Sequence, residues 1–280
     1  MKISTVIITK NEASNIARCL TSLTDVADEI IVVDAYSQDQ TEAICRTFPT
    51  VKFVSRTWTS FAAAKNFGND LATHDYILSV DADEVLSAEL RDELCDLKPN
   101  LRVQTPLGWS RTAYEMPRLN HVGTSPIRYC GWYPDVKIRL FPKNAARWVG
   151  DFVHERLDFD GKVERLKSHL LHFTFRSTEQ FECKLLYYAE LTAQEEFLKR
   201  HRSSFVFMLL KAEFKFLNVY FFKLGFLDGQ NGRLIANLLA KGIVWKYVAL
   251  QRLQRKENLW TILGYRFAAF LSPPRALSRN

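Results

Sequence analysis

The chain contains few cysteine, glycine and proline residues. Its 280 residues contain 5 Cys, 11 Gly and 9 Pro, too few for a collagen-like repeat or a disulfide-rich framework. The cysteines are odd in number and never form a Cys-x-x-Cys pair, so no zinc site built on thiolates is expected. We expect reduced thiols, as in the cytoplasm, and either one large domain or two smaller ones.

Long apolar runs are also missing. The stretch Ile3–Thr9 is followed at once by Lys10, Asn11 and Glu12, which makes it too short for a secretory signal. The longest apolar run of the last third, Phe205–Leu210, is broken by Lys211, whereas a spanning helix needs roughly 20 apolar residues. We therefore expect neither a signal peptide nor a transmembrane segment.

Acidic residues are scarce in the last third of the chain. Residues 201–280 hold 13 Lys and Arg against 3 Asp and Glu, a net charge of +10, whereas residues 1–100 carry a net charge of −7. This asymmetry predicts a polyanionic partner for the tail: nucleic acid, an anionic membrane surface or a phosphorylated substrate. No helix-turn-helix, zinc-finger or RNA-recognition signature is present, so we do not expect nucleic acid binding.

The first hundred residues alternate between two periodicities. Buried strands are predicted at Ile3–Thr9, Glu29–Ala35, Val51–Ser55 and Tyr76–Val80. Helices are predicted at Ala13–Leu23, Thr41–Phe48, Phe61–Ala72 and Ser87–Leu97. Such alternation is typical of an α/β fold with a mostly parallel, Rossmann-like sheet flanked by helices. Ligands bind such sheets at the carboxyl ends of the strands.

The pattern changes twice further along the chain. After Pro99 the sequence is richer in Gly, Pro and aromatic residues, and we expect these residues to extend the same domain. From Ser177 onward the spacing is helical, with a break at Gly225–Gly232. We therefore divide the chain at residues 1–98, 99–176 and 177–280, the last being a helical C-terminal extension.

Asp81 and Asp83 give the strongest chemical signal. They directly follow the predicted strand Tyr76–Val80, and Glu84 comes next. Two carboxylates two positions apart suit one Mg²⁺ or Mn²⁺ ion, which often completes its shell with substrate phosphates. A solvated acidic loop contains the same short motif, but the end of a parallel strand favours a metal and diphosphate site.

Asp34 and Lys65 are further polar candidates. Asp34 ends the second strand, where a carboxylate can accept a hydrogen bond from a base or a ribose hydroxyl. Asp39 and Thr41, which follow, fit the cap of the next helix. Lys65 lies among apolar neighbours and suits a diphosphate contact, an ion pair with Asp81 or an ordinary surface position.

Taken together, these motifs resemble the nucleotide-binding half of a family 2 glycosyltransferase with the GT-A fold. The resemblance is carried by Val6–Glu12, Asp34-x-x-Ser37-x-Asp39-x-Thr41, Ala64–Asn66 and Asp81–Asp83. Later segments resemble a narrower group, the bacterial lipopolysaccharide core β-1,4-glucosyltransferases. Those segments are Lys137–Phe141, Val153–Glu155, Leu171–Phe173 and Gly225–Gly229.

The resemblance implies what each region does. Residues 1–98 would bind the nucleotide sugar, residues 99–176 would bind the acceptor, and the donor would be UDP-glucose. Six residues would contact the donor: Thr9, Glu12, Asp34, Lys65, Asp81 and Asp83. Asp81 and Asp83 would also hold a divalent cation, Mg²⁺ or Mn²⁺.

An inverting transfer needs a general base for the acceptor hydroxyl. Glu155 is the first candidate, although a surface pair with Arg156 is an alternative interpretation. Asp135 is the second, because it follows Trp132-Tyr133-Pro134, whose rings suit stacking on a sugar. His154 and His172 are candidate ligands of the metal or the diphosphate, although a lone histidine in an apolar run also fits the core.

The tail mixes aromatic residues with lysines. Eight rings (Phe205, Phe207, Phe214, Phe216, Tyr220, Phe221, Phe222 and Phe226) alternate with Lys211, Lys215 and Lys223. This composition suits an anionic bilayer surface, and it also suits a core beneath a basic face. We expect peripheral association with the cytoplasmic face of a bacterial inner membrane.

We therefore predict a metal-dependent inverting hexosyltransferase that moves glucose from UDP-glucose to a heptose of the lipopolysaccharide inner core. A nucleotidyltransferase acting on a sugar phosphate is one alternative, but Thr9–Glu12 lacks the glycines of a phosphate loop. A non-catalytic module that keeps the fold and binds a membrane or polyanion is the other.

Overall fold

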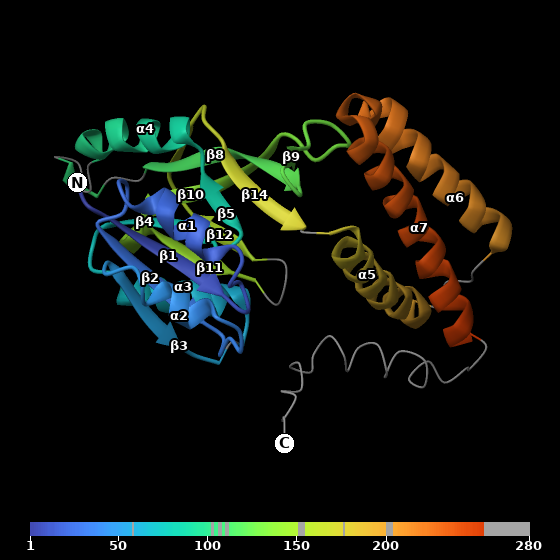
Figure 1. Ribbon diagram of the computed structural model, residues 1–280, viewed down its shortest axis with the longest axis horizontal. Coiled ribbons are helices and arrows are strands. Elements are labelled where there is room, and N and C mark those ends of the chain that lie inside the picture. The colour runs from blue at the N-terminus through green and yellow to red at the C-terminus, as the bar shows by residue number, and fades with distance from the viewer. Residues whose placement is uncertain are drawn as a thin grey trace, which may run out of the picture. The chain divides into compact units, whose positions relative to one another are not determined.

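Strands and helices alternate through the first hundred residues, as the periodicity predicts (Figure 1). The structure is a computed structural model that describes residues 1–57, 59–101, 104–105, 108–109, 112–150, 155–175, 177–199 and 204–254. The first strands are β1 (Ile3–Thr9), β2 (Glu29–Asp34), β3 (Val51–Ser55), β4 (Tyr76–Asp81) and β5 (Glu84–Leu86). The helices among them are α1 (Ile16–Leu23), α2 (Thr41–Cys45), α3 (Phe61–Leu71) and α4 (Ala88–Leu97), followed by η1 (Lys98–Asn100).

The middle of the chain is built of strands, and the last part is helical. The strands are β6 (Gln104–Thr105), β7 (Gly108–Trp109), β8 (Thr112–Val122), β9 (Ser125–Pro126), β10 (Asp135–Pro142), β11 (Ala146–Val149), β12 (Arg156–Phe159), β13 (Lys162–Arg165) and β14 (Leu170–Phe175), with η2 (Lys143–Ala145) between β10 and β11. The last part contains α5 (Thr178–Leu198), α6 (Phe205–Leu217), η3 (Asn218–Phe222), η4 (Gly225–Asp228) and α7 (Gly229–Gln254).

The chain divides into two compact units, each described by itself below. Unit 1 consists of Met1–Pro126 and Trp132–Thr174, and unit 2 consists of Ile127–Gly131 and the chain from Phe175 onward. Among the described helices, none combines the length and the apolar character that crossing a bilayer requires.

The main sheet of unit 1 has a parallel half and a mostly antiparallel half. Its strand order is β3-β2-β1-β4-β10-β8-β14-β5. The first four strands pair in parallel, and β10 joins β4 in antiparallel orientation. The register sets Thr9 opposite Asp34 and Ile8 opposite Asp81. The carboxyl ends of β1, β2 and β4 therefore meet at one edge of the sheet.

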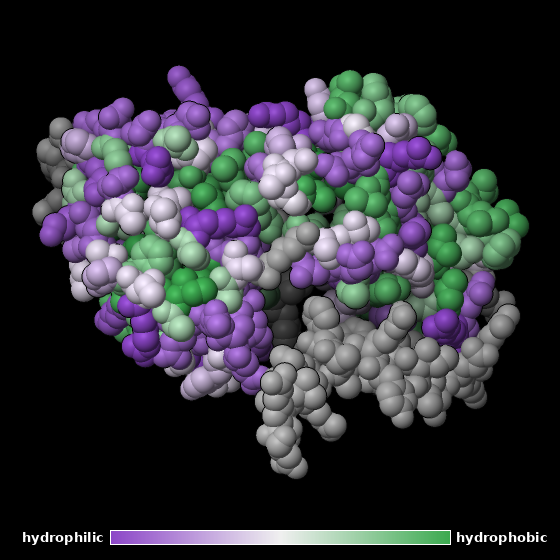
Figure 2. Space-filling view, viewed as in Figure 1, coloured by the Kyte–Doolittle hydropathy of each residue, from purple (hydrophilic) through white to green (hydrophobic). Residues whose placement is uncertain are grey.

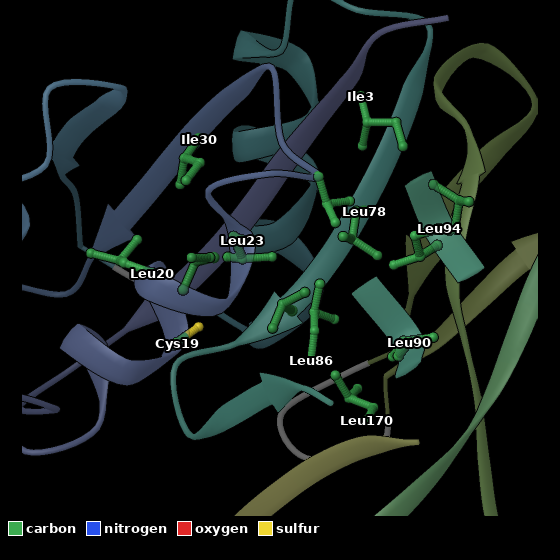
Figure 3. Packing of buried hydrophobic residues seen from close by; sticks show 14 of the residues in the cluster. Ile3, Cys19, Leu20, Leu23, Ile30, Leu78, Leu86, Leu90, Leu94 and Leu170 are labelled. Carbon is green, nitrogen blue, oxygen red and sulfur yellow. The ribbon is translucent and has the colours of Figure 1, made fainter. Parts of the chain in front are cut away.

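Apolar side chains cover both faces of the parallel strands, as in sheets of this kind. Figure 3 shows one of the two clusters, in which Leu23 of α1 and Leu90 of α4 lie around Ile3 and Leu78 of the sheet. The other cluster lies under α3, whose small residues allow a close approach to β1 and β2. Burial on both faces explains the continuous β-branched runs in the sequence and fixes the position of the strand ends.

Serine side chains set the starts of the two helices that flank β4. Ser60 accepts a hydrogen bond from the N–H of Ala63 at the start of α3, and Ser87 accepts one from the N–H of Leu90 at the start of α4. Each bond satisfies a backbone donor that has no partner within the helix. Ser87, the first residue of the predicted helix Ser87–Leu97, is therefore the N-cap of α4.

In unit 2, α7 packs against both α5 and α6. The predicted break at Gly225–Gly232 is shorter than expected, because α7 begins at Gly229 rather than at Arg233. Gly232 lies in the first turn of α7, where an added Cβ would be 1.7 Å from the carbonyl oxygen of Gly225. This glycine therefore permits a close backbone contact instead of ending a helix.

Candidate active site

Three of the predicted donor-binding residues lie where parallel strands end. Thr9 ends β1, Asp34 ends β2 and Asp81 ends β4. Thr9 and Asp34 are each only 2% exposed. Within the described part of the chain, the buried hydroxyl of Thr9 has no hydrogen-bond partner, so it is free to bond a group that enters this edge of the sheet.

Asp34 joins the two loops that follow β1 and β2. Its carboxylate accepts two hydrogen bonds from Ser37, one from the side-chain hydroxyl and one, at 2.7 Å, from the backbone N–H. The same hydroxyl accepts the N–H of Asn11 at 2.8 Å, and the N–H of Glu12 bonds the hydroxyl of Thr41 at 2.9 Å. The motif therefore fixes the shape of both loops, and its contacts with a ligand stay a prediction.

The capping role considered for Asp39 is also present. Its carboxylate accepts the N–H of Thr41 at 3.0 Å and the N–H of Ala13 at 3.0 Å. Glu12, in turn, accepts a hydrogen bond from the side-chain amide of Asn15 at 2.6 Å. These bonds order the loops without any ligand.

Lys65 lies between two carboxylates and is 2% exposed, so it is not a surface lysine. Its Nζ is 3.1 Å from Oδ1 of Asp81 and 3.3 Å from Oε1 of Glu155. The ammonium also lies 4.5 Å from the ring centroid of Trp148. The structure thus brings together Lys65 and Asp81, as one sequence alternative proposed, and adds Glu155 to them.

Arg139 holds the other side of Asp81. Its guanidinium lies 2.6 Å from Oδ2 of Asp81 and also bonds the buried carboxylate of Glu84. Burial raises the pKa of Asp81, but Arg139 and Lys65 lower it by more, so that this pKa lies well below its usual value. Glu84 also accepts the backbone N–H of Asp81 at 2.9 Å. Asp81 is therefore ionised and fixed from three sides.

Arg118 extends this chain of alternating charges to Asp135. Its Nη1 lies 3.1 Å from Glu84, and its Nε donates to Asp135 at 2.8 Å. Lys137 lies 3.0 Å from the other oxygen of Asp135. Burial raises the pKa of Asp135, while Arg118 and Lys137 lower it to a net value below the usual one. Asp135 is thus held by two cations, Arg118 and Lys137, whereas the described contacts of Glu155 include one, Lys65.

Asp83 is paired with His172. The carboxylate of Asp83 lies 3.3 Å from Nε2 of His172, and Nδ1 of that histidine lies 2.6 Å from Oδ1 of Asn120. The backbone carbonyl of Asp83 accepts the N–H of Phe173 at 2.9 Å. Strand β14 therefore places a histidine beside the second aspartate, whereas His154 lies outside the described residues.

The side chains around Asp83 offer few donors to a divalent cation. In the described ranges, no group of three or more His, Cys, Asp and Glu side chains is placed to hold a metal ion. Asp83 and His172 nevertheless supply one oxygen and one nitrogen donor, neither of them fully buried. Because Mg²⁺ is commonly held by one or two carboxylates together with substrate phosphates, two donors fit a cation that arrives with a diphosphate.

The residues that sequence reasoning missed are Arg118 and Arg139. The segment Lys137–Phe141 was part of the resemblance, but no role followed from it. Pairing between β10 and β8 shifts register between Ile138 and Leu140, and such a bulge re-aims a side chain. The alternation of side chains between the two faces of a regular strand therefore could not predict that Arg139 contacts Asp81.

The chain is similar to several known proteins. The family model described as Glycosyl transferase family 2 matches residues 4–121. An uncharacterized glycosyltransferase of Rickettsia felis is 30% identical over 82% of this chain and 83% of its own. The lipopolysaccharide core biosynthesis glycosyltransferase LpsC of Rhizobium meliloti is 26% identical over 90% of this chain and 95% of its own. The crystal structure of S. aureus TarS 1-349 in complex with UDP-GlcNAc aligns with a TM-score of 0.42 and 15% identity over 92% of this chain and 93% of that one.

The chain belongs to glycosyl transferase family 2. The protein is therefore a transferase that acts in glycosyl transfer. Family membership, together with the parallel strands β1 to β4 and their flanking helices, confirms the GT-A fold that the sequence resemblance implied.

Proposed function

We propose that this glycosyltransferase moves glucose, with inversion, from UDP-glucose to a heptose of the lipopolysaccharide inner core. The observation that carries the proposal is the acidic pair Asp81 and Asp83 at the end of β4, with Lys65, Arg139 and His172 around it. The similarity to LpsC over most of both chains supports an acceptor of this class.

The donor would lie along the carboxyl ends of β1, β2 and β4. Thr9, Glu12 and Asp34 would contact the uridine, and Lys65 the diphosphate. Asp83 and His172 would hold a divalent cation, Mg²⁺ or Mn²⁺, which when bound neutralises charge on the departing diphosphate. Asp81, fixed by Arg139 and Glu84, would keep this end of the loop in place.

Glu155 would act as the general base. Its carboxylate would take the proton of the acceptor hydroxyl as that oxygen bonds to the anomeric carbon. The bond from this carbon to the diphosphate would break on the opposite face, and UDP would leave. The ion pair with Lys65 at 3.3 Å holds the carboxylate beside Asp81, which supports this placement of the base.

We further propose that the enzyme works at the cytoplasmic face of the bacterial inner membrane, bound peripherally through its basic C-terminal helices. An acceptor anchored in lipid would be reached from such a position. The net charge of +10 in residues 201–280 supports attraction to anionic lipid.

A screen of UDP-sugars tests the donor assignment. The protein would be heated with UDP-glucose, UDP-GlcNAc or UDP alone, with Mn²⁺ or with EDTA, and unfolding would be followed. UDP-glucose with Mn²⁺ should raise the unfolding temperature most, because a ligand that binds only the folded state stabilises it. Equal unfolding temperatures with every nucleotide, with and without metal, would contradict the proposal.

A further inference from the structure

Helix α6 carries apolar residues on nearly every side, yet little of it is buried. Within α6 only Met208 and Ala212 are buried. Val206, Leu210 and Phe214 are each between 63% and 65% exposed. A helix that is apolar all round normally lies in a core or a membrane, so the exposed side chains of α6 suit an apolar environment.

The exposed residues share one face and continue past the helix. Val206, Leu210, Phe214 and Leu217 are spaced by four, four and three residues, which places them along one side of α6. The chain from η3 to η4 adds five more exposed apolar residues: Phe221, Phe222, Leu224, Phe226 and Leu227. We call these nine residues the α6–η4 face. Figure 2 shows hydrophobic side chains gathered over α6 and over the end where it meets α7.

Lysines flank the α6–η4 face rather than cover it. Nζ of Lys211 lies over the rings of Phe207 and Tyr247, the latter on α7, so this lysine lies on the side toward α7. Lys215 follows one turn later and is half-buried. Residues 204–227 contain three lysines and a single acidic residue, Glu213. Long cationic side chains beside apolar surface place their charges at the level of lipid phosphates.

We infer that the α6–η4 face inserts its aromatic and aliphatic side chains into the surface of an anionic bilayer. Helix α6 has 13 residues and is about 20 Å long, shorter than the hydrocarbon core of roughly 30 Å, so it lies in the interface instead of spanning it. A second copy of the chain fits less well, because a symmetric contact would bring together the three lysines of each copy with a single acid, Glu213, to compensate them. This inference specifies the membrane contact of the proposed function, but it assigns binding to apolar insertion rather than to net charge.

Vesicle co-sedimentation tests the inference with the full chain and two matched triple variants. The test variant is Leu210→Ser, Phe214→Ser and Phe222→Ser, on the α6–η4 face. The control variant is Leu191→Ser, Phe197→Ser and Leu198→Ser, which replaces three exposed apolar residues of α5. Vesicles of phosphatidylethanolamine and phosphatidylglycerol, without acceptor, are used at low and high salt.

The wild type and the control should partition alike and keep most of their binding at high salt. The test variant should bind at least about tenfold more weakly, because each large apolar side chain contributes strongly to interfacial binding. Unchanged partitioning of the test variant would overturn the inference, as would equal loss in the control. A wild-type dimer that the test variant dissociates, without any change in vesicle binding, would show that the face binds a second copy.

Hydrolysis of UDP-glucose, measured on the same samples, separates this inference from the proposed function. The test variant should hydrolyse the donor as the wild type does, because none of its three positions lies in the candidate active site. Lost vesicle binding with normal hydrolysis supports both proposals. If the wild type binds vesicles but does not hydrolyse UDP-glucose, the membrane inference is supported and the donor assignment is contradicted.

Discussion

Asp83 is the carboxylate whose removal should most directly affect the chemistry. Asp83→Ala takes away the oxygen donor beside His172 where negative charge builds on the departing diphosphate. Losing one charge-stabilising group typically lowers kcat by roughly 10²–10³. The fold should survive, because Asp83 lies in the turn after β4 and outside the apolar clusters. Steady-state kinetics and thermal unfolding are the measurements.

The matched control for this change is Asp92→Ala, an exposed aspartate on α4. It should leave both kcat and the unfolding temperature unchanged. Near-normal turnover by folded Asp83→Ala would contradict a metal site at Asp83.

Glu155 and Asp135 can be separated as candidate bases. Glu155→Gln should keep donor binding and lower transfer by about 10²–10⁴-fold, because an amide cannot take the proton of the acceptor hydroxyl. Asp135→Asn should have a smaller effect on transfer, since Asp135 is held by two cations, Arg118 and Lys137, and Glu155 by Lys65. Binding of UDP-sugar and single-turnover transfer are measured for both variants. Normal transfer by Glu155→Gln beside inactive Asp135→Asn would assign the role to Asp135.

Arg139 is 3% exposed, and we expect it to contribute strongly to the free energy of unfolding. Arg139→Met leaves the buried carboxylate of Glu84 and the partly buried carboxylate of Asp81 with fewer cations around them. Breaking a buried pair in this way costs roughly 3–5 kcal/mol of unfolding free energy. The control is Arg147→Met, whose pair with Asp70 is exposed at 3.8 Å and should contribute less than about 1 kcal/mol. Urea unfolding measures both, and equal stability of the two variants would contradict the buried role of Arg139.

At this scale the sequence predicted the motif residues better than their partners. Asp34, Asp81 and Asp83 were found because they directly follow buried strands, which is a local pattern. Arg139 was not, because its contact with Asp81 depends on a bulge and on strand pairing across 58 positions. Likewise, the neighbours of Lys65 in the sequence are apolar, and only the fold brings Asp81 and Glu155 to it.

Two glycines in helices test how closely the elements pack. Gly68 lies in α3, where an added Cβ would be 2.4 Å from Cγ1 of Val6 on β1. Gly68→Ala should therefore lower the unfolding free energy by about 1–3 kcal/mol, because the well-packed contact has no room. Gly242 in α7 is the control, since its nearest neighbour would be Leu185 at 3.9 Å.

Gly242→Ala should raise stability by roughly 0.5–1 kcal/mol, as alanine favours a helix interior over glycine. Chemical denaturation of the two variants in parallel is the measurement. A stable Gly68→Ala variant would show that α3 does not pack as tightly on β1 as the structure indicates.

Element boundaries were predictable where periodicity was strong. Strands β1 and β3 have the predicted bounds, and α4 begins one residue after Ser87, where the helix was predicted to start. The start of α7 was predicted too far along the chain, after Gly232 instead of at Gly229. In a sequence, a glycine that ends a helix looks the same as one that only permits a close backbone contact. The fate of the tail aromatics was likewise open, since spacing along a helix does not tell a core face from an exposed one.

For the whole molecule, the charge asymmetry of the sequence predicted a polyanionic partner for the tail. The structure adds that most of the aromatic residues in 205–226 are exposed, which sets aside the interpretation of the tail as an ordinary core. Charge alone did not distinguish a basic face from an apolar face with basic flanks, because that difference depends on how α6 packs on α7.

The proposed function requires that the site around Asp83 and Glu155 transfers a sugar from a UDP-sugar to a separate acceptor. The most direct test incubates the protein with UDP-glucose, Mn²⁺ and a heptose-containing core oligosaccharide, and quantifies UDP, pyrophosphate and the new glycoside by NMR. We expect one UDP per glucose transferred, a β-linked product, no pyrophosphate, and loss of transfer in EDTA and in Asp83→Ala. Release of pyrophosphate, or undiminished transfer by Asp83→Ala in EDTA, would contradict the proposed function.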